Sequence, residues 1–150
     1  MGKSSFGFKK PEDSPGFLLW QTTMTWQRLI KSALEPYDIS HAQFVILAVV
    51  LWFEETKQIP IQSAIVDKTK LDKMTVSKSL KKLVSRGFVK RNEHAEDTRA
   101  KSVCLTGKGK TLIKKLVPIV EGIDYEFFGA IKKGDQQSLI QFLCCLTKKT

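Results

Sequence analysis

Residues 72–85 combine two sets of side chains at helical spacing. The apolar set would form one stripe of a helix and consists of Val76, Leu80, Leu83 and Val84. The opposite face would carry Met74, Thr75, Lys78, Lys81, Lys82 and Ser85. Lysines neutralise phosphate groups, and a short polar side chain such as that of Thr75 allows a close approach to bases. These residue types therefore predict nucleic-acid recognition, with Thr75 and Lys78 in the major groove. The candidates for phosphate contacts are Lys73, Lys81 and Lys82.

A second candidate pair, Asp97 and Arg99, lies in a charged segment between two short runs of strand character. An arginine at the tip of a hairpin can enter the narrow, strongly negative minor groove of DNA. Asp97, two residues earlier, would hold the Arg99 guanidinium or brace the turn. Alone, the tripeptide would more simply form a surface ion pair that contributes little. Its position after a lysine-faced helix favours the DNA interpretation.

The positive charge of the chain is confined to one third of its length. The net charge is +10 over 150 residues, and residues 67–115 hold fifteen Lys or Arg against five Asp or Glu. The remaining residues hold ten of each sign, so they contribute no net charge. A basic surface in one segment predicts a polyanionic partner, nucleic acid first and an anionic membrane second, although it could be only a solvated face.

Helical patterns precede and follow this basic segment. A first helix is expected from Pro15 to about Glu35, because proline suits a first turn and Pro36 discourages continuation. Ser40 and Gln43 predict a capping box for a second helix over residues 42–55, apolar nearly all round and so central. A short helix over 62–70 follows. Asp72 would cap the lysine-faced helix, and Gly87 would end it in a left-handed cap.

The rest of the chain predicts a hairpin and two helices. Residues 88–93 and 101–106 have the pattern of two short strands, with 94–99 as their turn. Thr106 would cap a long helix that runs to about Phe128 and is kinked at Pro118. Residues 129–134 break the pattern, and Asp135 would cap a last helix. The fold class is therefore mainly α with a small β-hairpin.

Two short helices followed by a hairpin form the winged helix–turn–helix arrangement, whose second helix suits the major groove. The chain resembles the MarR family of bacterial transcriptional regulators from about Phe17 to Leu146. The most specific element is the D-x-R wing followed by L-T-x-x-G, here Asp97, Arg99, Leu105, Thr106 and Gly109. Where the family often has glycine between the two short helices, this chain has Lys70, for which a left-handed conformation would cost ~1 kcal/mol.

The resemblance implies a homodimer whose N- and C-terminal helices interlock, so that two winged modules straddle a palindromic site. It also matches Lys78 to a recognition-helix position that usually contacts DNA, and Arg99 to the wing arginine. We therefore expect a flexible leader at 1–14 and a single MarR-like domain at 15–150. Within that domain, the winged helix–turn–helix core would span about 39–106, and the dimerisation helices would span about 15–36 and 107–147.

The sequence also contains candidate residues for a small-molecule site. Many regulators of this family release DNA when a small phenolic or other aromatic ligand binds, and four residues could line such a pocket: Trp20, Met24, Trp26 and Trp52. Aromatic and methionine side chains at helical spacing are more often core, which is the interpretation we favour. No metal is expected, because His41 and His94 have no partners at ligand spacing. No cofactor is expected, no enzymatic motif is present, and a redox role for the three cysteines is unsupported.

The sequence thus predicts a cytoplasmic, homodimeric DNA-binding regulator, a repressor if it follows most such families, with double-stranded DNA as its partner. A membrane role is not expected, because the apolar run 44–53 is shorter than the ~20 residues that cross a bilayer. One alternative is a non-regulatory nucleic-acid binder, such as a replication or RNA-associated winged-helix protein. Another is a basic protein–protein adaptor that binds no nucleic acid.

Overall fold

The computed structural model describes residues 2–93 and 101–148, and within them the chain is mainly helical with one small hairpin. The helices are α1 (Pro15–Leu34), α2 (His41–Glu55), α3 (Gln62–Thr69), α4 (Lys73–Ser85), α5 (Gly107–Phe128) and α6 (Lys133–Thr147). The strands are β1 (Val89–Glu93) and β2 (Lys101–Leu105), and short 3₁₀ turns occupy η1 (Pro11–Asp13) and η2 (Glu35–Tyr37). The predicted fold class is confirmed.

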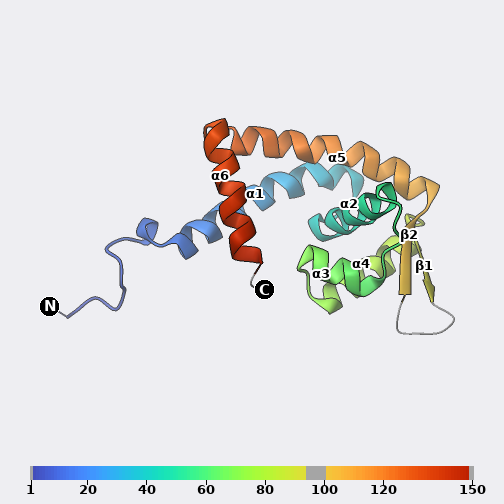
Figure 1. Ribbon diagram of the computed structural model, residues 1–150, viewed down its shortest axis with the longest axis horizontal. Coiled ribbons are helices and arrows are strands. Elements are labelled where there is room, and N and C mark those ends of the chain that lie inside the picture. The colour runs from blue at the N-terminus through green and yellow to red at the C-terminus, as the bar shows by residue number, and fades with distance from the viewer. Residues whose placement is uncertain (1, 94–100, 149–150) are drawn as a thin grey trace.

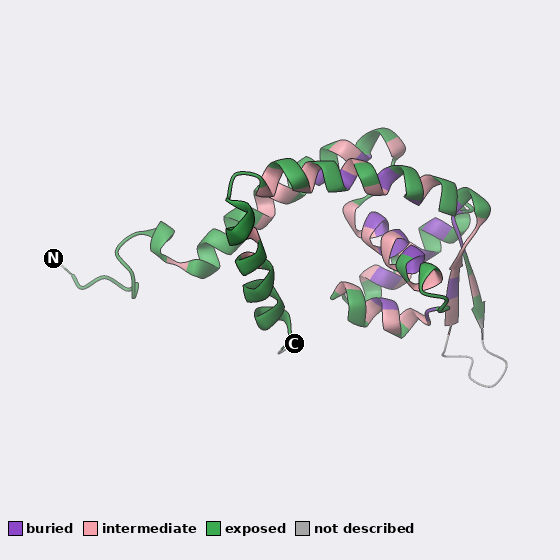
Figure 2. Cartoon of the chain, turned by 45° about the horizontal axis from the view of Figure 1, so that its top comes forward, coloured by how far each residue is buried: buried purple, intermediate pink, exposed green. Residues whose placement is uncertain are grey.

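One lobe holds α2, α3, α4 and the hairpin, and the long α5 runs along it beside α1 (Figure 1). The first half of α1 and the whole of α6 project away from that lobe (Figure 1). Buried residues are concentrated in the lobe and in the parts of α1 and α5 that cover it, whereas α6 has no buried residue (Figure 2). The chain therefore has one well-packed lobe and two helical arms whose apolar faces are open.

The predicted helix starts are confirmed with one exception. Pro15 opens α1, and Ser40 and Gln43 form a reciprocal capping box at α2. Thr106 caps α5, accepting a hydrogen bond from the Gly109 N–H at 3.0 Å. The prediction for Asp135 is wrong, because α6 begins two residues earlier at Lys133. The Asp135 carboxylate lies in the first turn instead, where it favourably faces the positive end of the helix dipole.

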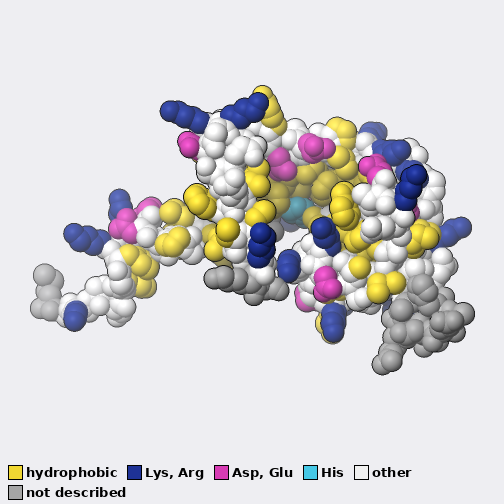
Figure 3. All heavy atoms as spheres, viewed as in Figure 1, with side chains coloured by type: hydrophobic (Ala, Val, Ile, Leu, Met, Phe, Trp, Pro, Cys, Tyr) yellow, Lys and Arg dark blue, Asp and Glu magenta, His cyan; other side chains and the backbone are white. Residues whose placement is uncertain are grey.

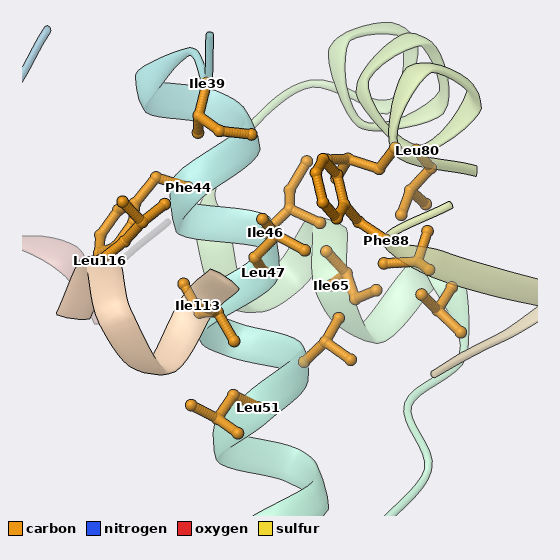
Figure 4. Close-up of a cluster of buried hydrophobic side chains, with 14 of the residues drawn as sticks. Ile39, Phe44, Ile46, Leu47, Leu51, Ile65, Leu80, Phe88, Ile113 and Leu116 are labelled. Carbon is orange, nitrogen blue, oxygen red and sulfur yellow. The ribbon is translucent and has the colours of Figure 1, made fainter. Parts of the chain in front are cut away.

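The core is built around α2, as its apolar composition predicted. Ile46 and Leu47 of α2 contribute to a cluster with α4 residues such as Leu80 and α5 residues such as Ile113 and Leu116 (Figure 4). Burying a side chain of this size contributes about 1.5–3 kcal/mol. The expected core stripe of α4 is confirmed for Val76, Leu80 and Leu83, which are fully buried. The prediction is wrong for Val84, which is 39% exposed. The buried face of α4 is narrower than the four-residue stripe that we expected.

Two left-handed residues frame the lysine-faced helix. Lys70 follows α3 with φ of 61°, and its N–H donates to the Val66 carbonyl at 3.0 Å. The lysine therefore does adopt the left-handed turn, at a cost of about 1 kcal/mol. Gly87, with φ of 78°, follows α4 as predicted. The Phe88 N–H bonds the Leu83 carbonyl at 2.9 Å and the Gly87 N–H bonds Val84 at 3.0 Å, which satisfies the end of the helix and directs the chain into β1.

The long α5 is one helix that contains Pro118, and the kink expected there stays a prediction.

Among the described residues, no single helix has both the length and the apolar composition to cross a bilayer. The pair Pro15–Tyr37 and His41–Glu55 meets that test only jointly and bends by 81° at its break. The apolar character of α2 is accounted for by its burial in the lobe.

Candidate nucleic-acid interface

The lysine face of α4 is held outward by the packing of its opposite face. Val76, Leu80 and Leu83 are buried against the core, which fixes the rotation of the helix. All four predicted α4 lysines are consequently exposed: Lys73, Lys78, Lys81 and Lys82. At about 100° per residue, Lys78 points almost directly away from the buried stripe, Lys81 and Lys82 lie on either side of Lys78, and Lys73 lies nearest the buried stripe. This arrangement would let central side chains reach bases while flanking ones meet phosphates.

Thr75 is engaged within the start of the helix. The Asp72 carboxylate caps α4 by accepting the Thr75 N–H at 2.7 Å through Oδ1, and the Thr75 hydroxyl donates to Oδ2 at 2.7 Å. These two hydrogen bonds, the backbone one first, lower the pKa of Asp72 from its ordinary value of 3.8. Thr75 is half-buried, and its oxygen retains a lone pair with which it can accept a hydrogen bond from a base edge.

A groove lies between α4 and the start of α2. Its volume is about 700 Å³, and it is lined by Ser40, Ala42, Gln43, Thr75, Lys78, Ser79, Lys81, Lys82 and Ser85. The structure therefore brings together four of the five α4 residues predicted to contact DNA, and Lys73 lies outside the groove. Three lysines and several hydroxyl groups in one open groove form a surface suited to a phosphate backbone.

The hairpin is anchored at its base to α2. The strands β1 and β2 pair antiparallel from Val89 opposite Leu105 to Glu93 opposite Lys101. The Glu54 carboxylate of α2 accepts the Leu105 N–H at 2.8 Å and lies 3.8 Å from the Lys110 ammonium. This contact fixes where the hairpin leaves the lobe. The two wing-tip candidates, Asp97 and Arg99, lie outside the described residues.

The L-T-x-x-G element has a physical explanation at the junction of the hairpin and α5. The Thr106 hydroxyl donates to the Gly87 carbonyl at 2.6 Å while it caps α5. Gly109 is buried against Phe88, and a Cβ at this position would overlap the Phe88 carbonyl oxygen and lie 2.8 Å from its carbonyl carbon. Only glycine lets α5 approach the segment between α4 and β1 this closely.

Arg86 is a positioning residue that the sequence patterns did not indicate. Its guanidinium donates to the carbonyl oxygens of Asp38 and of Tyr37, the latter at 3.2 Å, so it ties the end of α4 to the turn between α1 and α2. The guanidinium also lies 5.0 Å from the ring centre of Phe88. No local pattern could reveal these partners, because they lie 48 and 49 residues away in the chain.

The four proposed pocket residues do not converge within one chain. Trp26 donates its indole N–H to Asp124 at 2.7 Å and stacks edge-on against His41, whose pKa is lowered by burial although Asp124 opposes that shift. Trp52 lies at the other end of α2, with the Lys68 ammonium 4.7 Å above its ring. The favoured core interpretation is wrong for Trp20 and Trp52, which are 61% and 49% exposed. Met24 and Trp26 are half-buried.

Exposed apolar side chains gather in one region of the surface. Hydrophobic side chains gather around the hollow between α6 and the winged lobe, with lysines and arginines near its rim (Figure 3). A smaller cavity of about 370 Å³ lies beside the turn between α1 and α2, lined by Gln27, Lys31, Glu35, Asp38, Ile39, Ser40 and His41. Among the described residues, no group of three His, Cys, Asp or Glu side chains could hold a metal ion.

Comparison with known proteins agrees with this geometry. The family described as ArnR1-like, winged-helix domain matches residues 35–122. The chain is 36% identical over 128 residues to the uncharacterized HTH-type transcriptional regulator YdcH of Bacillus subtilis (strain 168), covering 85% of this chain and 87% of that protein.

Solved structures share the fold. The structure of Bordetella bronchiseptica BpsR, whose description concerns regulation of DNA binding by 6-hydroxynicotinic acid, superposes with a TM-score of 0.83 at 21% identity, covering 94% of this chain and 98% of that one. A mutant MarR from Escherichia coli complexed with operator DNA gives a TM-score of 0.76 at 23% identity, covering 90% of this chain and 95% of that one. The chain therefore belongs to the family of ArnR1-like winged-helix domains and to the HTH-type transcriptional regulators, and it has the fold of MarR.

Proposed function

We propose that the protein is a homodimeric repressor that works in the cytoplasm and binds a palindromic operator, with α4 in the major groove and Arg99 in the adjacent minor groove. The observation that carries this proposal is the exposed lysine face of α4, held outward by the buried stripe of Val76, Leu80 and Leu83. Lys78 would contact a base, and the flanking lysines would contact phosphates. The Arg99 and Asp97 roles follow from the sequence motif, and the anchored hairpin base supports them.

The apolar arms support a dimer. Exposed hydrophobic side chains occur in the first turns of α1 and along α6: Phe17, Leu18, Leu19, Trp20, Ile140, Phe142, Leu143 and Leu146. A helix of 15 residues with no buried side chain is at best marginal in water by itself. A second copy related by a two-fold axis would cover both arms at once and would place the two α4 helices to read a two-fold symmetric site.

The proposal includes release of the DNA by a small aromatic effector. Trp20 and Trp52 are exposed in the single chain, so they can contribute to a pocket that a partner subunit completes. The BpsR description gives a precedent for ligand-regulated DNA binding on this fold.

The first experiment is selection of bound sequences from a randomised duplex pool, followed by titration of the enriched sequence at several salt concentrations. A palindrome with a steep salt dependence is expected, because each neutralised phosphate releases counterions. Light scattering should give twice the 17.0 kDa mass of the chain. Placing the enriched sequence between a promoter and a reporter should lower transcription when the protein is added, whereas a rise would indicate an activator.

Other outcomes identify the alternatives. Salt-dependent binding without enrichment of any sequence would indicate a non-regulatory nucleic-acid binder. Absence of binding at low salt would indicate a protein–protein adaptor. A monomer that still enriches a single half-site would overturn the dimer and leave DNA recognition in place.

A further inference from the structure

Met74 is an exposed apolar residue in the middle of a basic face. It lies in the first turn of α4 and is 71% exposed. Lys78 and Lys81 follow at i+4 and i+7, so all three side chains lie on one stripe that points away from the core. Among the described residues of this stripe, Met74 alone is apolar and cannot form a charged contact with a phosphate.

The position of Met74 along the helix matters as much as its exposure. The N-terminal residues of a recognition helix are those that contact base edges in the major groove. Asp72 caps α4 and fixes the first turn through its two hydrogen bonds with Thr75, so the direction of the Met74 side chain is set by an ordered backbone. Met74 therefore occupies the end of the helix that would enter the groove most deeply.

We propose that Met74 is a specificity-determining residue that contacts the 5-methyl group of a thymine in each half-site. This assignment rests on the proposed function. Of the groups on base edges in the major groove, the thymine methyl is the apolar one, and a flexible thioether adapts its shape to such a group. A protein partner is disfavoured, because burying Met74 would also desolvate Lys78 and Lys81, whereas DNA supplies a base acceptor for Lys78 and a phosphate for Lys81.

The test removes the methyl group from the DNA and the thioether from the protein. Each thymine of the selected operator is replaced in turn by deoxyuridine, which lacks the 5-methyl group and keeps every hydrogen-bonding edge. At one symmetric position, this replacement should weaken binding by the parent protein about fourfold for each half-site. Met74→Ala should weaken binding to the thymine operator by a similar factor and should not discriminate thymine from uracil at that position.

Two further variants serve as controls. Met74→Leu keeps an apolar side chain and should retain most of the thymine preference. Ile59→Ala removes an apolar side chain that is equally exposed, at 71%, from the loop between α2 and α3, and should bind like the parent. Thermal unfolding of each variant checks that the fold is kept, and the deoxyuridine series on the parent requires no variant at all.

The outcomes separate this assignment from the proposed function. Equal affinity of the parent for the thymine and uracil forms at every position would overturn the Met74 assignment and leave operator binding intact. The assignment would also be overturned if Met74→Ala weakened binding by the same factor on the thymine operator and on the uracil operator at every position. Groups in contact should instead show coupled effects on affinity. Failure to enrich any sequence would overturn the proposed function and this assignment together.

Discussion

The guanidinium of Arg86, at the end of α4, donates a 3.2 Å hydrogen bond to the carbonyl oxygen of Tyr37, in the turn that joins α1 to α2. A second guanidinium nitrogen donates to the neighbouring Asp38 carbonyl. Lys108 of α5 in turn donates from its ammonium to the Arg86 carbonyl at 3.1 Å. The helix that carries the lysine face is therefore tied at its end both to the first helical pair and to α5.

Arg86→Ala should lower the free energy of unfolding by about 1–3 kcal/mol, because it leaves two carbonyls without their charged donor. Arg86→Lys should recover only part of that loss, since one ammonium cannot reproduce the two-pronged geometry of the guanidinium. Urea unfolding at one fixed protein concentration measures both. Lys90→Ala, an exposed lysine of β1, is the control and should change stability by less than about 0.5 kcal/mol. A midpoint for Arg86→Ala equal to that of the parent would contradict this role.

Two glycines of α5 should differ in their response to the same substitution. Gly109→Ala should lower the free energy of unfolding by about 2–3 kcal/mol, because the new methyl group would overlap the Phe88 carbonyl. Gly107→Ala, two residues earlier, has no heavy atom within 4 Å of the new methyl group and should be neutral or slightly stabilising. Parallel chemical unfolding of the two variants measures the difference, and equal stabilities would show that the close approach at Gly109 does not exist in solution.

Asp72 should give α4 a dependence on acid. Its folded-state pKa is below its ordinary value of 3.8, chiefly because the carboxylate accepts hydrogen bonds from Thr75. The contribution of Asp72 to stability is therefore fully present above that unfolded-state value and is lost as the pH falls through the lower folded-state pKa. Asp72→Ala should melt at a lower temperature at pH 7 and should lose less stability than the parent as the pH falls below 3.8.

Asp72→Asn is the matched variant, because asparagine caps a helix about as well as aspartate but does not titrate. It should melt near the parent at pH 7 and share the weaker acid dependence of Asp72→Ala. Superimposable acid profiles for parent, Asp72→Ala and Asp72→Asn would show that the cap does not contribute to stability.

Lys78→Ala should reduce affinity for the selected operator by about 1–3 kcal/mol if Lys78 contacts a base. Fluorescence anisotropy with operator and random duplexes distinguishes a base contact from a phosphate contact. An equal loss on random DNA would assign Lys78 to phosphate. Lys114→Ala, which removes an exposed lysine from α5, controls for the loss of one positive charge.

Arg99→Ala should weaken operator binding with little change in thermal unfolding, because a wing tip buries little surface. The slope of log affinity against log salt should also fall by about one if the arginine lies near phosphates. A large drop in unfolding temperature would instead make Arg99 a structural residue.

The sequence by itself determined the elements of this protein and the type of its site. Helix starts at Ser40, Asp72 and Thr106 were predictable because a cap depends on residues within three or four positions. Helical periodicity, which is also local, predicted the buried stripe of α4 and hence which lysines face outward, and the glycine cap predicted the left-handed Gly87. Local patterns failed at Asp135, which could either cap the helix or lie in its first turn, and at Val84, which could be either buried or exposed at the edge of the stripe.

Only the tertiary structure decided the contacts that join these elements. Arg86 finds its acceptors in another turn, Glu54 accepts from a strand 51 residues away, and Gly109 is required by a carbonyl of the segment after α4. Trp20 and Trp52 have core-like positions in the sequence and yet remain exposed. The physical reason is range: caps and periodicity act through the backbone within one or two helical turns, whereas these contacts depend on how whole helices pack against one another.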